Sequence, residues 1–250
     1  MRATGFLIQA EGVFHLVTAR HVVIGSDGSR TDSQLTAYYN LKTRGVAASP
    51  LSEMIRALGT NWVMADDESV DLALIPFAFD VNVADVLTIQ RGLFLPLTEL
   101  PETTDLIFLA FQPTDLRASR VAPFIRGGLV SRLNEDGTFY MDGPAFPGNS
   151  GSPVFVRPTG TRFTRRGFAL GSDPIAFRFV GVVGEYIPYI DVAVSPQTGR
   201  PRVSFEENTG LTRVWSADHL DRLIQSTAFK EQVKRLRKRG LVNSANTQTA

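Results

Sequence analysis

With 250 residues, the chain can bury a substantial hydrophobic core, either as one domain or as two smaller ones. Hydrophobic residues make up 43% of it and charged residues 20%, as is ordinary for a soluble globular protein, and a net charge of +1 argues against a protein that binds nucleic acid. The absence of cysteine excludes a disulfide framework, so packing alone must hold the fold, which favours a prokaryotic protein or a cytoplasmic location.

The first residues, Met1 to Thr4, run straight into a predicted strand, without the apolar segment or cleavage site of a signal peptide. No apolar run approaches the roughly 18 residues of a membrane-spanning helix. We therefore expect a cytoplasmic protein without a membrane span.

The first half of the chain contains short predicted strands and no long helical period. The first two strands flank a turn at Glu11-Gly12, and His21 follows them after a small-residue turn. Strands are predicted at 5–8, 14–17, 35–41, 61–65 and 72–76. Short strands at this spacing favour an antiparallel barrel or sandwich.

The segment from Leu93 to Asp105 is rich in Pro, Thr and Glu and is predicted to be a linker between two halves. Two long loops are predicted beyond it, at 157–176 and 196–208. The predicted strands of this second half are 106–111, 128–133, 139–141, 154–156, 179–183 and 211–214. The second half therefore also favours an antiparallel β-structure.

One helix is predicted near the end of the chain. Leu220, Leu223 and Ile224 repeat at helical spacing, and Ser216 is a plausible N-cap. The end of this helix is basic, with Lys234, Arg235, Arg237, Lys238 and Arg239. This cluster is either a solvated helix end that complements the helix dipole or a docking element for a protein partner. The polar tail after Leu241 is predicted to be disordered.

The most informative motif is the run of small residues from Pro147 to Pro153, which contains Ser150 and leads into an apolar strand. Glycine permits a sharp turn, and consecutive backbone N–H groups in such a turn can converge on an anion. An ordinary loop before a strand would have the same composition. The motif also differs from the Gly-x-Ser-x-Gly elbow, because Ser152 stands in place of the second glycine.

Two further motifs precede this one, a histidine directly after a strand (His21) and a carboxylate that opens an apolar strand (Asp71). The order His21, Asp71, Ser150 is that of chymotrypsin. The sequence resembles the trypsin/chymotrypsin-like serine proteases over residues 4 to 225, and Gly-Asn-Ser-Gly is most similar to the bacterial HtrA-type members. The matching blocks are Thr4–Ile8, Thr18–Val22, Asp71–Leu74 and Gly148–Pro153.

The resemblance implies an all-β fold of two six-stranded antiparallel Greek-key barrels, with a C-terminal α-helix packed on the second barrel. The N-terminal barrel would span 1–95 and the C-terminal barrel 96–215. The helix would span 216–240 and the tail 241–250. No cofactor and no metal is expected.

The resemblance also implies a serine endopeptidase that works through an acyl-enzyme. Ser150 would be the nucleophile, His21 the general base and acid, and Asp71 the group that orients the imidazole. The oxyanion hole is assigned to Gly148, Asn149 and Ser150, with the N–H groups of Gly148 and Ser150 as donors. In family members that are activated by cleavage, the new amino terminus pairs with an aspartate directly before the serine. Asn149 stands at that position and carries no charge, so we expect it to hydrogen-bond locally.

Other residues compete for these roles. His15 lies within an apolar strand and His219 on the helix, which predicts structural or surface roles for both. Ser152 is the nearest competing hydroxyl. Asp66, Asp67 and Glu68 compete with Asp71, but they form a polar cluster typical of a turn.

The substrate-binding residues are predicted in two segments. The first, Pro144-Ala145-Phe146, would line an uncharged pocket and favour small or medium apolar side chains before the cleaved bond. The second, Gly184-Glu185-Tyr186, would be the edge to which an extended peptide adds as a β-strand. Asp142, eight positions before Ser150, is assigned a structural role.

Two other functions remain as hypotheses. One is a catalytically silent module that keeps the fold and binds peptides, although binding alone does not require His21 and Asp71. The other is a protease domain of a larger regulatory system, docked through the basic helix. Too little chain follows residue 225 for a PDZ-like second domain.

Overall fold

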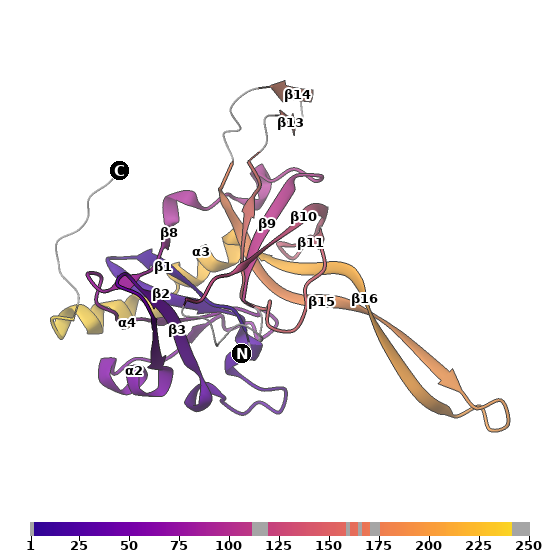
Figure 1. Cartoon of the computed structure of the whole chain (residues 1–250), viewed down its shortest axis with the longest axis horizontal. Coiled ribbons are helices and arrows are strands. Elements are labelled where there is room, and N and C mark those ends of the chain that lie inside the picture. The colour runs from indigo at the N-terminus through magenta and orange to yellow at the C-terminus, as the bar shows by residue number, and fades with distance from the viewer. Residues whose placement is uncertain (1–2, 112–119, 159–160, 165–166, 171–175, 242–250) are drawn as a thin grey trace.

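The computed structural model describes residues 3–111, 120–158, 161–164, 167–170 and 176–241. Apart from Leu241, the predicted disordered tail lies outside the described residues. Strands dominate the structure, and two helices follow them at the C-terminal end (Figure 1). The all-β prediction is therefore confirmed in its main feature.

The N-terminal half is built on a five-stranded sheet in the order β5-β6-β2-β1-β8. The hairpin of β1 and β2 turns at Glu11 and Gly12, both of which have positive φ. The sheet comprises β1 (Phe6–Ala10), β2 (Val13–Thr18), β5 (Val63–Met64), β6 (Ala73–Pro76) and β8 (Thr88–Gln90). Because β6 pairs with β2, the residues just before β6 lie beside the end of β2.

A second sheet of three strands, in the order β4-β3-β7, completes this half. Its strands are β3 (Thr36–Leu41), β4 (Val46–Pro50) and β7 (Ala84–Asp85). β4 ends at Pro50, which has no N–H to donate and begins α2 (Leu51–Leu58), a helix that the sequence analysis did not predict. Among the described residues no strand pairing joins the two sheets, so a closed N-terminal barrel is not confirmed.

The C-terminal half forms a closed six-stranded barrel in the order β10-β11-β16-β15-β12-β9. All six pairings are antiparallel, as predicted for this half. The strands are β9 (Asp105–Ala110), β10 (Phe124–Leu133), β11 (Thr138–Asp142), β12 (Pro153–Val156), β15 (Phe179–Val194) and β16 (Pro201–Ser216). Phe108, Phe139 and Met141 fill its interior and are fully buried.

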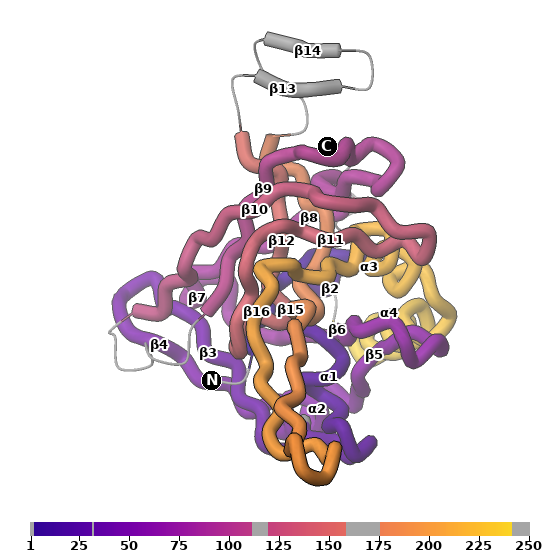
Figure 2. The backbone as a smooth tube through the Cα atoms, turned by 90° about the vertical axis from the view of Figure 1, so that its right-hand side faces the viewer, coloured from indigo at the N-terminus to yellow at the C-terminus, as the bar shows by residue number. Residues whose placement is uncertain are grey.

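Both predicted long loops of this half contain strands. β13 (Thr161–Thr164) and β14 (Gly167–Leu170) form a hairpin within the first. The second prediction is wrong from Pro201 onward, because β15 and β16 continue past the barrel as a paired two-stranded arm that projects from the molecule (Figures 1 and 2). Pro196 and Gly199 belong to the short turn between the strands, and Pro201 is the first residue of β16.

Two helices stand where one was predicted, α3 (Ala217–Gln225) and α4 (Thr227–Lys238). Ser216 occupies the N-cap position of α3, but its hydroxyl pairs with His219 Nδ1 and does not cap the helix. Leu220 and Phe229 share one buried cluster with Ile8 and Leu74 of the N-terminal sheet. The same cluster contains Phe179 and Trp215 of the barrel, so the apolar faces of the helices pack on both halves and not on the second barrel alone.

The basic end of α4 binds the same chain. Arg237 donates to the carboxylate and the carbonyl of Glu11, and Arg239 donates to the carbonyls of Leu58 and Ala57. These intramolecular contacts account for part of the basic cluster without a partner protein. The predicted docking role of this helix is not supported. None of the described helices is long and apolar enough to cross a membrane.

Candidate active site

His21 lies on a single helical turn, α1 (Arg20–Val23), directly after β2 ends. The Asp71 carboxylate binds this turn twice. Oδ1 accepts a hydrogen bond from the His21 backbone N–H, and Oδ2 is paired with His21 Nδ1, both at 2.8 Å. One carboxylate therefore fixes both the backbone and the ring of the histidine, as the pairing of β6 with β2 allows.

The electrostatic surroundings favour the protonated form of His21. The hydrogen bond that His21 donates to Asp71 raises the pKa of His21 above its ordinary value, against an opposing effect of burial. The charges of Asp71 and Glu185 raise this pKa further. The imidazole is half exposed, so it remains accessible from the solvent side.

Ser150 lies on the loop between β11 and β12, in a backbone that only glycine permits at two positions. Gly148 has φ 98° and Gly151 has φ 83°, both in the left-handed region. A Cβ on Gly151 would lie 2.2 Å from the carbonyl oxygen of Thr4. The glycines on either side of Ser150 are therefore required by conformation, and the second also by close contact.

Some backbone N–H groups of this loop donate hydrogen bonds within the protein, and others do not. Asn149 N–H donates to the Phe146 carbonyl, and the Asn149 side-chain oxygen accepts from Phe146 N–H, both at 2.9 Å. Within the described residues, the N–H groups of Gly148 and Ser150 donate to no protein atom. The predicted local hydrogen bond of Asn149 is thus confirmed, but its backbone N–H is not available for the predicted oxyanion hole.

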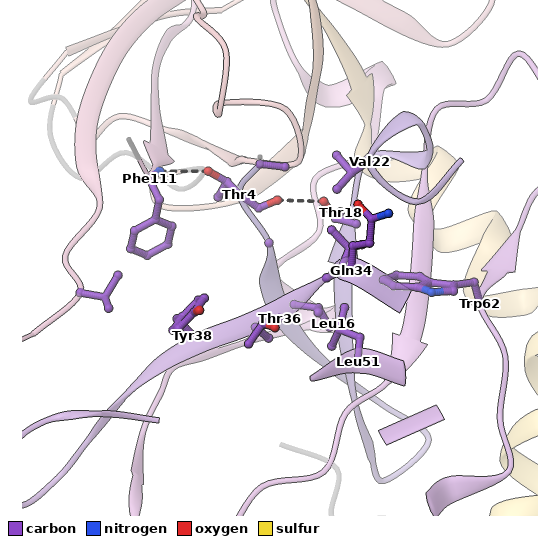
Figure 3. A pocket seen from close by; sticks show the side chains of 15 residues that line it. Thr4, Leu16, Thr18, Val22, Gln34, Thr36, Tyr38, Leu51, Trp62 and Phe111 are labelled. Atoms are coloured by element: carbon purple, nitrogen blue, oxygen red, sulfur yellow. Dashed lines mark hydrogen bonds between the residues drawn. The ribbon is translucent and has the colours of Figure 1, made fainter. Parts of the chain in front are cut away.

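Thr4 ties this loop to the N-terminal half. Its N–H donates to the Ser150 carbonyl at 3.0 Å, and its hydroxyl donates to the Gly148 carbonyl at 2.8 Å. Thr18 in turn donates to the Thr4 carbonyl, and Phe111 N–H donates to the Thr4 hydroxyl (Figure 3). The N–H and the hydroxyl of Thr4 have partners more than a hundred residues away, which no local sequence pattern reveals.

Thr4 also borders a separate cavity of about 330 Å³, which is lined mainly by residues of the N-terminal half and also by Phe111 and Val121. Trp62, Tyr38 and Leu51 line it together with Thr18 (Figure 3). The wall of this cavity contains none of His21, Asp71 and Ser150. Its importance for the site is therefore confined to the Thr4–Thr18 contact.

A second cavity, of about 380 Å³, brings the three predicted catalytic residues together. His21, Asp71 and Ser150 all line it, although the Ser150 hydroxyl and the imidazole are not hydrogen-bonded to each other among the described contacts. Five of the six predicted substrate-binding residues line it too, namely Ala145, Phe146, Gly184, Glu185 and Tyr186. Pro144 is exposed and lies outside this wall.

The cavity wall also contains residues that the sequence analysis missed. Arg213 lies over the Trp215 ring, with 4.9 Å from its guanidinium carbon to the ring centroid. It pairs with Asp136 at 2.7 Å and approaches Glu185 at 3.8 Å. β16 therefore brings a guanidinium into the same wall as Ala145 and Phe146 of the predicted uncharged segment. The preference for apolar side chains remains a prediction.

The competing histidines lie outside this cavity. His15 is fully buried against Phe229, and burial lowers its pKa to about 4. Burial also lowers the pKa of His219, which contacts Ser216. Both histidines therefore have structural surroundings, as predicted.

The competing acids and the second serine also lie away from the site. Asp66, Asp67 and Glu68 lie in a polar turn outside the cavity wall. Ser152 is fully buried, and its hydroxyl has no hydrogen-bond partner among the described residues. In the part of the chain that the structure describes, no group of three or more His, Cys, Asp or Glu side chains is placed to hold a metal ion.

The chain was compared with known protein families. The model of the trypsin-like peptidase domain family matches residues 3–161. A search of curated proteins finds no match.

The solved structures that match include three proteases, all at low identity. A serine endoprotease from Yersinia pestis is 12% identical with a TM-score of 0.47, covering 92% of this chain and 58% of that one. A thermostable serine protease from an extremophilic microorganism is 10% identical with a TM-score of 0.45, covering 92% and 90%. A Glu endopeptidase is 14% identical with a TM-score of 0.44, covering 95% and 91%. The chain thus spans little more than half the length of the Yersinia protein.

Proposed function

Because the chain belongs to the family of trypsin-like peptidase domains, we propose that it is a serine endopeptidase with Ser150, His21 and Asp71 as its catalytic triad. The observation that carries this proposal is that one cavity holds Ser150 and a histidine that Asp71 binds at two points. The substrates would be peptides or proteins, since the family acts on these. Binding of a peptide alone would not require the doubly bound histidine.

In the proposed reaction, Ser150 Oγ attacks the carbonyl carbon of the peptide bond while His21 Nε2 takes its proton. His21 then returns the proton to the leaving amine, which gives an acyl-enzyme. A water molecule, deprotonated by the same imidazole, hydrolyses the acyl-enzyme and restores the Ser150 hydroxyl. Asp71 keeps Nδ1 protonated, so that Nε2 presents its lone pair, and it stabilises the imidazolium that forms.

The negative charge that develops on the carbonyl oxygen would be held by the N–H groups of Gly148 and Ser150. These are the amides of the loop that donate to no described protein atom, whereas Asn149 N–H is engaged. Losing one such donor typically lowers the rate by about 10²–10³. The double contact between Phe146 and Asn149 would hold the loop in this form before the substrate binds.

The substrate would add to the edge of β15 after Val183. Up to that residue, β15 is paired with the segment around β12, and beyond it the edge at Gly184–Tyr186 faces the cavity. An extended peptide could therefore bind there through backbone hydrogen bonds. Glu185 and Arg213 would lie beside its side chains.

Chemical labelling tests the nucleophile directly. A fluorophosphonate probe should modify Ser150 and no other serine, as located by mass spectrometry of the digested protein. Denatured protein serves as the control, because an unfolded chain cannot activate the hydroxyl. Absence of labelling in the folded protein would contradict the proposal and favour a silent peptide-binding module.

We expect kcat/KM for peptide hydrolysis to rise with pH through a midpoint above about 6.5, since His21 must be neutral to act as a base and its pKa is raised. At pH values below this midpoint the imidazole is protonated and activity is lost. Glu185→Gln should move the midpoint to lower pH, because it removes a charge that raises this pKa. A pH–rate profile measures both, and a midpoint at or below about 6.5 in the native protein would contradict the assignment.

Thr4→Val is expected to lower kcat on the order of 10²-fold, because it removes the hydroxyl that holds the Gly148 carbonyl and so loosens the oxyanion hole. Thr4→Ser keeps the hydroxyl and is the matched control, with activity close to that of the native chain. Steady-state kinetics with a peptide substrate separates kcat from KM. A loss in Thr4→Ser together with native activity in Thr4→Val would contradict the expectation, because valine keeps the methyl group and lacks the hydroxyl that makes the hydrogen bonds.

A further inference from the structure

The arm formed by the outer parts of β15 and β16, residues 187–208, has no described partner strand on either side. Its strand pairing is internal, from Pro188↔Asn208 to Val194↔Pro201, and the arm projects away from the barrel (Figure 1). At its base, Asn208 donates to the Ala145 carbonyl, and Glu206 accepts from the Tyr186 hydroxyl. Six of its apolar side chains are about half exposed, namely Tyr189, Ile190, Val192, Val194, Val203 and Phe205. Nothing in the described part of the chain covers them.

An isolated two-stranded ribbon that projects into solvent is unusual. Two strands alone are at best marginally stable in water, because they have two open faces and two open edges. An exposed edge with apolar side chains is also a template for another strand. The arm therefore has the properties of an interaction surface, and its sequence indicates which partner fits.

The segment Arg202-Val203-Ser204-Phe205-Glu206 on the outer edge of β16 is complementary to itself. Placed antiparallel to an identical strand with Ser204 opposite Ser204, it sets Arg202 opposite Glu206 and Val203 opposite Phe205. Opposite charges and apolar pairs at directly opposed positions both stabilise an antiparallel pair. The pattern repeats on both sides of Ser204, so one pairing satisfies two ion pairs and two apolar contacts.

The charged side chains needed for this pairing keep unused hydrogen-bonding groups in the described structure. Ala193 pairs with Val203 and Val194 with Pro201, so Arg202 is bulged out and has no partner on β15. Arg202 makes no ion pair among the described residues. Glu206 accepts from the Tyr186 hydroxyl through one oxygen, which leaves the other for a guanidinium. Val203 and Phe205 are each more than half exposed, at 52% and 54%.

We propose that the arm binds the arm of a second copy of this chain, with the two β16 strands antiparallel about a twofold axis at Ser204. Such an interface is isologous and closes on itself, so it yields a dimer and not a filament. The two arms would form a four-stranded sheet, in which the Val203 and Phe205 side chains of both copies meet at the centre. The inference does not depend on the catalytic assignment, because none of these residues lies in the catalytic machinery.

Charge reversal tests the register. Sedimentation velocity of the native chain, from micromolar to about 100 µM, should show a dimer that weakens at high salt. Arg202→Glu and Glu206→Arg should each weaken dimerisation at least about tenfold, because each turns two attractive pairs into repulsive ones. Mixing the two variants should restore a dimer, since both charge pairs between the copies then join opposite charges again.

Glu207→Arg is the matched control, because it makes the same change in charge one residue away, opposite Pro201 in this register. It should dimerise like the native chain, and circular dichroism should show that all variants are folded. A native chain that stays monomeric at the highest concentration would overturn the proposal. So would a dimer that neither single reversal weakens, or variants whose mixture fails to restore it.

Discussion

Replacing Ser150 with alanine is expected to lower kcat for peptide hydrolysis by on the order of 10⁶, the loss that follows removal of the nucleophile in a triad that acts as a unit. The other hydroxyls in the described cavity wall belong to Ser69 and Tyr186, and neither lies on the loop that carries the free N–H groups of Gly148 and Ser150. The fold should persist, because the Ser150 side chain makes no hydrogen bond in the described structure. Hydrolysis of a fluorogenic peptide measures the first expectation and thermal unfolding the second.

Ser152→Ala is the matched control for this variant. It removes the same atom two residues away, from a buried hydroxyl without a hydrogen-bond partner among the described residues. Removal of an unsatisfied buried group is neutral or stabilising, so activity and melting temperature should both be kept. If Ser150→Ala retained more than a few per cent of the activity while Ser152→Ala lost it, the nucleophile would have to be reassigned.

The candidate site could be predicted from the sequence where chemistry is carried by short motifs. His21, Asp71 and Ser150 were found because each follows or opens an apolar strand within a recognisable pattern, and the fold brings them to one cavity. Thr4 could not be found in this way, since its hydroxyl reaches Gly148 across 144 positions of sequence. Arg213 was missed for a related reason, because a charged residue within a predicted strand gives no sign of the surface that it faces.

The fold could be predicted where strands are short and bounded by turn residues. In the C-terminal barrel, the strands β9 to β12 each coincide with a predicted strand. The arm was missed because Pro201 and Gly199 are typical of loops, while the alternation from Arg202 to Glu206 is the real signal of a strand. The pairing of that segment with residues 188–194 is a long-range contact that local composition does not contain.

The placement of the C-terminal helices shows the same limit at the level of packing. Helical spacing identified the apolar residues of α3, but not the surface that they cover. In the structure, Leu223 and Val233 join a cluster with Val17 and Leu72 of the N-terminal half. The end of the chain thereby stabilises the sheet that leads to His21 and Asp71, so the two halves of the site are not independent.

Asp71→Asn is expected to lower kcat by on the order of 10⁴, because it reverses the tautomer of His21. Asp71 Oδ1 accepts a hydrogen bond from the His21 backbone N–H, so an asparagine would keep its oxygen there and turn its NH₂ group toward Nδ1. Nδ1 would then have to accept a hydrogen bond, which places the ring proton on Nε2. A protonated Nε2 cannot take the proton of Ser150, although the geometry of the site is unchanged.

The same substitution removes the main cause of the raised pKa of His21, so an NMR titration of the ring should show a lower midpoint in the variant than in the native chain. Glu68→Gln is the matched control, since it neutralises an exposed carboxylate that pairs with Arg20 at 3.5 Å and lies outside the cavity wall. Both the rate and the midpoint should remain native in that control. A variant Asp71→Asn with full activity would mean that the two hydrogen bonds to His21 only hold the fold, and the triad would lose its third member.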